Sequence, residues 1–384
     1  MRILVDIGHP AHIHYFKNCA RILTGKGYEF LFVVRERDST IELIQSTGFN
    51  FVSRGKGKKG LLNKLIGIPQ IDYKLIKIAR KFHPDMFLSF SSPYAAHVAT
   101  LMRKPHIAFD DTEHAKFEHW MCRPFTDVVL SPSCYNAKLW KNQLLFDSFM
   151  ELCYLHPNYF QPDKTVLERI GVKEGEKYCV LRLISWDANH DVGQHGLNYQ
   201  DKLHLVDELS KVCRVFISSE EKLDDTLQKY QLKIHPKDLH SILHYATLYV
   251  GEGSTTASES VLLCTPAIYI NSLHVGYTDE ERERGLLFQI SNIEGILEMA
   301  LMALNKEDFQ KNFKLNWEKL LVEKIDPTAL LVWFVENYPE SKHIMKENLD
   351  YQYRFGTPTA KAVPLNGGGY FAKSSVAPLT TDRE

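Results

Sequence analysis

Short apolar runs alternate with helical patterns along most of the chain. In the first half, the apolar runs have the length and bounding residues of buried strands. The strands expected there are 3–7, 29–34, 51–52, 86–90, 106–109 and 127–130. The segments between them repeat apolar residues every three or four positions, which predicts helices over 16–23, 39–45, 72–82, 94–102 and 113–122. Strands that alternate with helices predict a mainly parallel sheet covered on both faces.

The same alternation restarts after a loop that contains Pro157 and Pro162. Strands are expected over 178–183, 214–218, 247–250 and 267–270, and helices over 199–211, 220–230, 255–263 and 327–338. The sequence therefore predicts an α/β protein with two Rossmann-like domains facing a cleft. We expect a first domain over 1–163 and a second over 164–345, whose last helix crosses back onto the first. The glycine- and serine-containing segment 346–384 is expected to be a poorly ordered tail.

Composition excludes several classes of protein. A length of 384 residues suits two domains of ordinary size, and the formal net charge of −1 gives no general attraction to nucleic acid, so no nucleic-acid partner is expected. The seven cysteines form no C-x-x-C pair, which argues against a zinc site or a disulfide framework. The N-terminus lacks the apolar region of a signal peptide, and no run of about 18 apolar residues could span a bilayer. We expect a cytoplasmic protein.

The segment from Leu248 to Ile270 carries most of the functional argument. It is a strand, a loop of small residues, a helix, a tight turn and another strand. Free backbone N–H groups and the positive end of the helix dipole meet where the loop ends, and this is a ready site for a phosphate. Gly253 permits close backbone approach, while Ser254, Thr255 and Thr256 add hydroxyl groups. The alternative is a well-capped strand-to-helix turn without a ligand.

This segment resembles the second domain of GT-B glycosyltransferases and of the non-hydrolysing UDP-N-acetylglucosamine 2-epimerases. In those families a small-residue loop holds a diphosphate and a glutamate one turn into the helix holds the ribose; Gly253, Ser254, Thr255 and Glu259 match these places. The epimerases have two glycines where this chain has Ser254-Thr255. The opening Asp6 to Phe16 is similar to the start of the domain-of-unknown-function 354 family, over roughly residues 1–340. The resemblance implies GT-B architecture and a nucleoside diphosphate-sugar, with UDP favoured.

Candidate catalytic residues follow two strands of the first domain. His12 and His14 lie in the loop after the first strand, at the sheet edge where ligands collect in open α/β sheets, and histidine suits acid–base work near neutral pH. Their spacing could also suit a metal, but no third ligand is evident, so no metal or other cofactor is expected. The alternative for each is a loop histidine or a helix cap.

Asp110, Asp111 and Glu113 follow another strand of the first domain. Carboxylates at a strand end could deprotonate an acceptor hydroxyl or move a proton on a sugar. The epimerases carry a His-Val-Glu-Ala-Gly-Leu-Arg stretch at the similar place, where only Glu113 and Ala115 correspond and the arginine is absent. The other interpretation is a helix N-terminus whose acidic residues complement the dipole.

Three further segments or residues are weaker candidates for binding. Arg182 and Ser218 end two strands of the second domain and could contact a diphosphate or line the nucleotide pocket. The stretch 54–81 is basic, with Asp72 as its only acid and with interleaved leucine and isoleucine. It could lie on the anionic inner leaflet of a membrane, as in GT-B enzymes that use lipid-linked acceptors, or be a solvated loop.

Three functions remain open on the sequence. The first is a metal-independent glycosyltransferase that acts on a cell-envelope glycan or a lipid-linked acceptor, with a role in polysaccharide biosynthesis. The second is a UDP-sugar 2-epimerase-like enzyme, which needs no acceptor. The third is a protein that binds a sugar nucleotide without turning it over. The donor base, the sugar, the acceptor, the stereochemistry and the oligomeric state are not encoded in these motifs.

Overall fold

The computed structural model describes residues 1–56, 61–183, 197–219 and 223–356, and it contains two parallel sheets. The first sheet has the order β3-β2-β1-β4-β5-β6-β7 and the second the order β12-β11-β10-β8-β9. The strands are β1 Arg2–Ile7, β2 Glu29–Arg35, β3 Phe51–Gly55, β4 Met86–Phe90, β5 His106–Phe109, β6 Val128–Pro132, β7 Gln143–Phe146, β8 Tyr178–Leu183, β9 Arg214–Ser219, β10 Leu248–Gly251, β11 Ala267–Tyr269 and β12 Leu287–Gln289.

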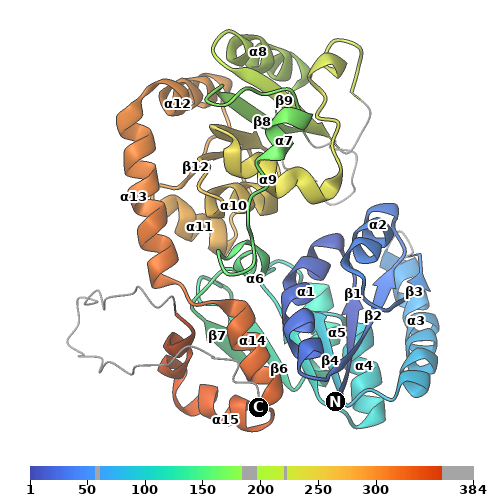
Figure 1. Ribbon diagram of the computed structural model, residues 1–384. Helices are drawn as coiled ribbons and strands as arrows, with labels where there is room; N and C mark the ends of the chain where they lie inside the picture. Colours follow the sequence, from blue (N-terminus) through green and yellow to red (C-terminus); the bar gives the residue numbers. More distant parts are fainter. Residues whose placement is uncertain (57–60, 184–196, 220–222, 357–384) are drawn as a thin grey trace.

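Helices separate these strands and cover the sheets (Figure 1). The α-helices are α1 Pro10–Gly25, α2 Asp38–Thr47, α3 Leu61–Phe82, α4 Pro93–Met102, α5 Lys116–Cys122, α6 Leu152–Leu155, α7 Thr165–Arg169, α8 Tyr199–Ser210, α9 Leu239–Tyr245, α10 Ser254–Leu262, α11 Gly276–Glu283, α12 Ile293–Asn305, α13 Glu307–Glu323, α14 Pro327–Glu336 and α15 Glu340–Glu347. Short 3-10 helices are η1 Arg123–Phe125, η2 Gln228–Tyr230, η3 Pro236–Asp238 and η4 Leu349–Phe355. Among the described residues, no helix is long and apolar enough to cross a membrane.

The central strands of each sheet are buried because helices pack on both faces. In β1, Ile3, Leu4, Val5 and Ile7 have no exposed surface, and α1 covers one face with Phe16, Ala20 and Leu23. In the second sheet β10 is buried throughout and lies between β8 and β11. Continuous apolar runs are what a two-sided parallel sheet requires, so the α/β prediction follows from burial.

One expected helix is wrong over the part that the structure describes. Residues 223–227 are not helical and form a turn at 225–227 before η2, although a helix was expected over 220–230. The side chain of Asp224 accepts hydrogen bonds from the backbone N–H groups of Thr226 (2.8 Å) and Leu227 (3.1 Å). A side chain that binds the backbone nearby competes with the helical hydrogen-bond pattern, which explains the turn.

The chain returns to the first domain at its end. Helix α13 leads down from the second domain, and α14 then lies beside α1 and α6 (Figure 1). Thr328 donates to the Cys153 carbonyl oxygen (2.8 Å), and Lys26 pairs with Glu336 (2.9 Å). Of the segment expected to be a tail, residues 346–356 continue through α15 and η4, and residues 357–384 lie outside the described residues.

Ion pairs of Lys324 hold the turn between α13 and α14 in place. Lys324 is buried, and its Nζ lies 2.7 Å from Asp147 of the first domain and 2.7 Å from Glu280 of α11. A buried ammonium needs such partners, because desolvation without them is costly. The two domains are thus joined at the crossover by a shared ion pair.

Candidate functional site

The loop after β10 is built for close backbone approach. A Cβ on Gly251 would lie 2.3 Å from the Tyr249 hydroxyl and 3.1 Å from Cβ of Arg182, so only glycine fits. Gly253 is the N-cap of α10 and makes no side-chain cap hydrogen bond. The first N–H groups of α10 are therefore left for another acceptor, which favours an anion at this place. The Tyr277 hydroxyl, from α11, donates to Oγ of Ser254 (2.8 Å) at the same helix end.

Glu259 lies just over one turn into α10 and is buried against both domains. Its Oε1 is 2.6 Å from the hydroxyl of Tyr154 and 3.0 Å from Nε2 of His240. Burial alone would raise the pKa of the Glu259 carboxyl, but the facing His240, together with Tyr154 and Arg182, lowers it. Glu259 is thus held as a carboxylate where the second domain meets α6.

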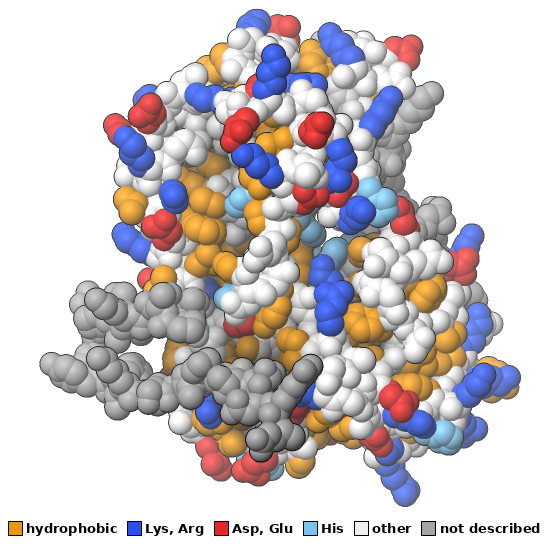
Figure 2. Space-filling model, viewed as in Figure 1, with side chains coloured by type: hydrophobic (Ala, Val, Ile, Leu, Met, Phe, Trp, Pro, Cys, Tyr) orange, Lys and Arg blue, Asp and Glu red, His pale blue; other side chains and the backbone are white. Residues whose placement is uncertain are grey.

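His14 joins this cluster from the first domain. Its ring centroid lies 4.9 Å from that of Tyr154 and 5.3 Å from that of His240. Lys17, one turn further along α1, has its Nζ 2.9 Å from Nδ1 of His14. Burial and Arg21 lower the pKa of Lys17 to about 8, while Glu259 opposes that shift. Histidine side chains gather between the two domains in the space-filling view (Figure 2).

His12 points elsewhere, because residues two apart on a helix do not share a face. Its ring stacks on Phe90 at 4.6 Å and on Tyr15 at 6.1 Å, and its Nδ1 accepts from the N–H of Gly8 (3.4 Å). Burial, His9 and nearby arginines hold the pKa of His12 well below its usual value. In the described part of the chain, no three His, Cys, Asp or Glu side chains are grouped to hold a metal ion. Metal independence stays a prediction.

The three acids after β5 have three different environments. Asp110 is completely buried and pairs with His119 (2.8 Å) and Arg123 (3.0 Å), so its carboxylate fixes the loop to α5 and η1. Asp111 accepts from the Thr112 hydroxyl (3.0 Å), and burial and the neighbouring Asp110 raise its pKa to about 7. A carboxyl that titrates near neutral pH is suited to proton transfer.

Glu113 makes a contact between the domains. Its Oε1 accepts from the backbone N–H of Gly276 (3.0 Å), the first residue of α11. The approach is close, since a Cβ on Gly276 would lie 1.8 Å from the Cys134 carbonyl oxygen. Glu113 therefore caps a helix of the second domain from the first, and α11 carries Tyr277 to Ser254.

Glu151 is a buried acid that the sequence did not single out. It lies directly before α6, is 2% exposed, and has a pKa raised well above the usual value by burial and by Asp111. Tyr15 lies within the electrostatic reach of both acids. The structure thus brings Asp111 and Glu151 into one electrostatic cluster between the domains.

The remaining candidates of the second domain are close to each other. Arg182, the residue before the last of β8, lies beside Ser218 of β9, and its Nη1 donates to Oγ of Ser218 (3.2 Å). Arg182 also acts electrostatically on Glu259. Thr256 is buried within α10, and its carbonyl accepts from the Ser260 hydroxyl. Ser254, Glu259 and Arg182 therefore belong to one region around the carboxyl ends of β8 and β10.

Residues 1–340 match the family described as Protein of unknown function (DUF354). The chain belongs to this family. An uncharacterized protein of Methanocaldococcus jannaschii (MJ0665) is 22% identical over 353 residues, which are 88% of this chain and 98% of that protein. The matched region of this DUF354 protein therefore includes parts of both domains.

Solved structures show the architecture of this DUF354 protein. The UDP-GlcNAc 2-epimerase from Neisseria meningitidis bound to UDP-GlcNAc superposes with a TM-score of 0.60 at 10% identity, covering 91% of this chain and 100% of the epimerase. The spinosyn rhamnosyltransferase SpnG complexed with spinosyn aglycone gives a TM-score of 0.59 at 14% identity, covering 88% and 100%. The expected fold, two Rossmann-like domains in the GT-B arrangement, is confirmed. At these identities the likeness establishes the fold alone.

Proposed function

We propose that this DUF354 protein is a glycosyltransferase that moves a sugar from a UDP-sugar to a glycan or lipid-linked acceptor of the cell envelope. The observation that carries the proposal is the Glu259 carboxylate, kept anionic one turn into α10, behind helix N–H groups that no side chain caps. A ribose hydroxyl can donate to such a carboxylate, and a diphosphate can bind the helix end. Arg182 adds positive charge within electrostatic reach of Glu259.

The reaction needs a base on the opposite side of the domain interface. In our proposal the Asp111 carboxylate takes the proton of the acceptor hydroxyl as that oxygen bonds to the anomeric carbon. The bond between that carbon and the diphosphate oxygen breaks, and the electron pair leaves with UDP. The N-terminus of α10 and Arg182 stabilise the charge that develops on the leaving diphosphate. His14 borders the same interface, and we assign His12, at the carboxyl end of β1, to the acceptor side with it.

The test of transfer is whether nucleotide release depends on an acceptor. Purified full-length protein is incubated with UDP-sugars, with and without extracts of envelope glycans and lipids, and free UDP is measured. Transfer predicts UDP release that rises with acceptor and labelled sugar that moves into the acceptor. UDP-sugar binding without release under any condition would contradict transfer and favour a binding protein.

A second candidate is a UDP-sugar 2-epimerase-like enzyme. It is favoured by Asp111 and Glu151, two buried acids whose pKa values burial raises and which act on each other. Proton removal and return next to the anomeric carbon would use such a pair. A new UDP-sugar formed without acceptor, with solvent deuterium at C2, would establish this activity in place of transfer.

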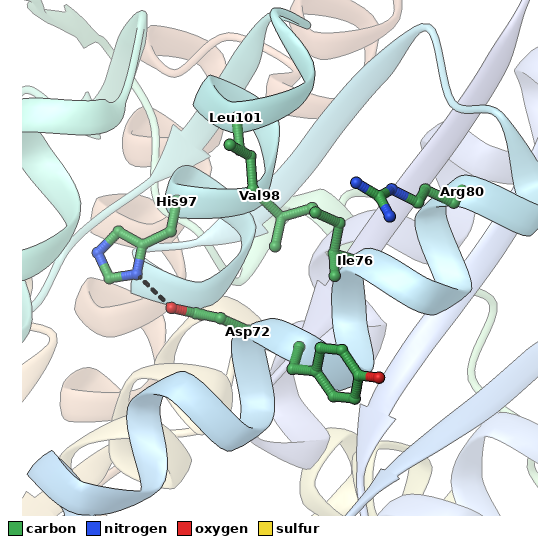
Figure 3. A pocket seen from close by; sticks show the side chains of 7 residues that line it. Asp72, Ile76, Arg80, His97, Val98 and Leu101 are labelled. Carbon is green, nitrogen blue, oxygen red and sulfur yellow. Dashed lines mark hydrogen bonds and ion pairs between the residues drawn. The ribbon is translucent and has the colours of Figure 1, made fainter.

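We further propose that the first domain contacts the inner leaflet of a membrane through its outer face, defined by Tyr73, Leu101, Trp120 and Phe125. Trp120 is 72% and Leu101 70% exposed, although both are large and apolar. A cavity of about 380 Å³ between α3 and α4 opens on this face, and its lining includes Asp72, Arg80 and Leu101 (Figure 3). Exposed aromatic residues beside lysine and arginine fit an anionic lipid surface.

The outer face overlaps the basic stretch 54–81 that the sequence indicated, since Tyr73 belongs to both, but it leaves out the start of that stretch. Arg54 is buried in an ion pair with Asp6 (2.8 Å) and does not belong to this face, and residues 57–60 lie outside the described residues. Co-sedimentation with phosphatidylglycerol vesicles tests the contact. We expect Trp120→Ser to bind about tenfold more weakly, while Trp140→Ser, at an exposed site near β7, binds as wild type. Equal binding of Trp120→Ser and wild type would contradict the contact.

A further inference from the structure

A cluster of arginine side chains lies where β1, β2 and β3 end, at a place other than the Glu259 site. The strand register places Ile7 beside Val34, and Arg35 beside Gly55. Arg35 therefore stands at the carboxyl edge of the sheet, between the loop after β1 and the end of β3. This is the edge at which ligands bind in open parallel sheets.

Two further cationic or titratable groups face the same edge. A Cβ on Gly8 would lie 3.7 Å from Cε1 of His12 and 3.9 Å from Nη2 of Arg54. The Arg54 guanidinium is held by its Nε, which donates to Asp6 (2.8 Å), and it lies over the ring of Tyr94 at 4.7 Å. Its Nη2 thus lies near the small residue Gly8.

The charges at this edge are not balanced within the described part of the chain. Asp6 offsets Arg54, but Nε of Arg35 is buried and has no hydrogen-bond partner among the described residues. Burial, then Arg37 and Arg54, lower the pKa of the Arg35 guanidinium. Glu36, the adjacent acid, is turned to the hydroxyl of Ser53 (3.4 Å).

The N-terminus of α1 adds to the same field. This helix of 16 residues begins at Pro10 and has no acidic residue in its first turn. Its positive dipole end therefore points to the loop after β1 without an acid to complement it. Like charges that are partly buried together cost free energy, and a bound anion would remove that cost.

We propose that Arg35, Arg37, Arg54 and the N-terminus of α1 bind an anionic group, a phosphate or a carboxylate, of the second substrate. The inference rests on the proposed function, because it takes the first domain as the acceptor side. Guanidinium groups match both oxyanions with two parallel hydrogen bonds. The acceptor is therefore an acidic molecule, and His12 lies next to its anionic group.

The experiment measures thermal unfolding of the full chain in low-salt buffer with saturating UDP, so that the α10 end is occupied. Inorganic phosphate, D-glucuronate, and sodium chloride at matched ionic strength are each titrated into wild type, Arg35→Gln and Arg103→Gln. Arg103 is exposed at the end of α4 and provides the same charge change in the same domain. We expect phosphate or glucuronate to stabilise wild type and Arg103→Gln where chloride does not. The stronger of the two identifies the acidic group.

Arg35→Gln separates binding from a structural role. We expect about tenfold weaker anion binding in this variant, with stability in the absence of anion equal to or above that of wild type, because repulsion is relieved. An unchanged anion response, a loss of stability without anion, or chloride as effective as phosphate would each refute the site. If UDP has no effect but the Arg35-dependent anion response persists, the proposed function fails and this site stands. A UDP response without an anion response refutes this site alone.

Discussion

The two sides of the domain interface present different chemical groups. On the side of the second domain, the residues around the α10 end are small, and the N-cap Gly253 offers no side chain to the first backbone N–H groups of that helix. On the side of the first domain, the interface is made of titratable side chains such as His14, Asp111 and Glu151, most of which are buried. Backbone groups keep their charge pattern at any pH, whereas buried acids and histidines change theirs. The second domain is thus suited to holding a nucleotide and the first to moving a proton.

The largest expected effect tests the first-domain side by removing one charge. Asp111→Asn should lower turnover by roughly 10²–10⁴-fold with little change in KM, because a general base contributes about that much. Since burial and Asp110 raise the pKa of Asp111 to about 7, the carboxylate forms only as pH rises through that value. The wild-type rate should therefore increase with pH across the neutral range. A pH profile of kcat that is flat from about 5 to 9 would exclude Asp111 as the base.

The next effect tests the second-domain side by adding one methyl group. Gly251→Ala places a Cβ 2.3 Å from the Tyr249 hydroxyl, so the loop must shift. We expect a loss of about 1–3 kcal/mol in the free energy of unfolding and weaker UDP binding. Chemical denaturation and calorimetry measure both quantities. Gly25→Ala is the control, because nothing lies within 4 Å of a Cβ there; similar results for the two variants would show that the loop is not tightly packed.

The smallest expected effect distinguishes whether Glu113 acts as a general base or as a helix cap. Because its Oε1 accepts from Gly276 N–H, Glu113→Gln can keep the contact while Glu113→Ala cannot. We expect Glu113→Ala to lose about 1 kcal/mol of stability and to bind UDP more weakly, with Glu113→Gln close to wild type in both. Stability measurements and turnover are compared for both variants. A glutamine variant as inactive as the alanine variant would show that the carboxylate itself takes part in the chemistry.

The sequence pattern predicted the features that depend on residues close together in the chain. Most strands of both sheets and the turn from Gly253 to Glu259 are contiguous in sequence, and their periodicity and small residues are visible without a structure. The edge strands β7 and β12 were missed because they are runs of only four and three residues, and each has two partly exposed side chains. The turn at Asp224 was missed because its cause is a side-chain hydrogen bond.

The partners of the site residues could not be predicted in the same way. Tyr154 and Glu259 are hydrogen-bonded although 105 positions separate them, and Glu113 meets Gly276 across 163 positions. Nothing near Tyr154 or His240 in the sequence marks either of them as a neighbour of Glu259. Of these contacts, only the one between Lys17 and His14 had a local signal, because the two residues are three positions apart on a helix. Contacts between domains arise from the fold as a whole.

In our proposal, Glu259 and the α10 end bind the nucleotide of a sugar donor. The most direct measurement is thermal stability with UDP and with UDP-, GDP-, CDP- and dTDP-sugars, for wild type, Glu259→Gln, Glu259→Ala and Glu298→Ala. Glu298 is exposed on α12 and serves as the matched control. Ligand at about a hundredfold over its Kd should add roughly 2.7 kcal/mol to wild type and Glu298→Ala. We expect a shift specific to one base that both Glu259 variants lose. A shift that survives in both Glu259 variants, or no shift with any nucleotide, would contradict it.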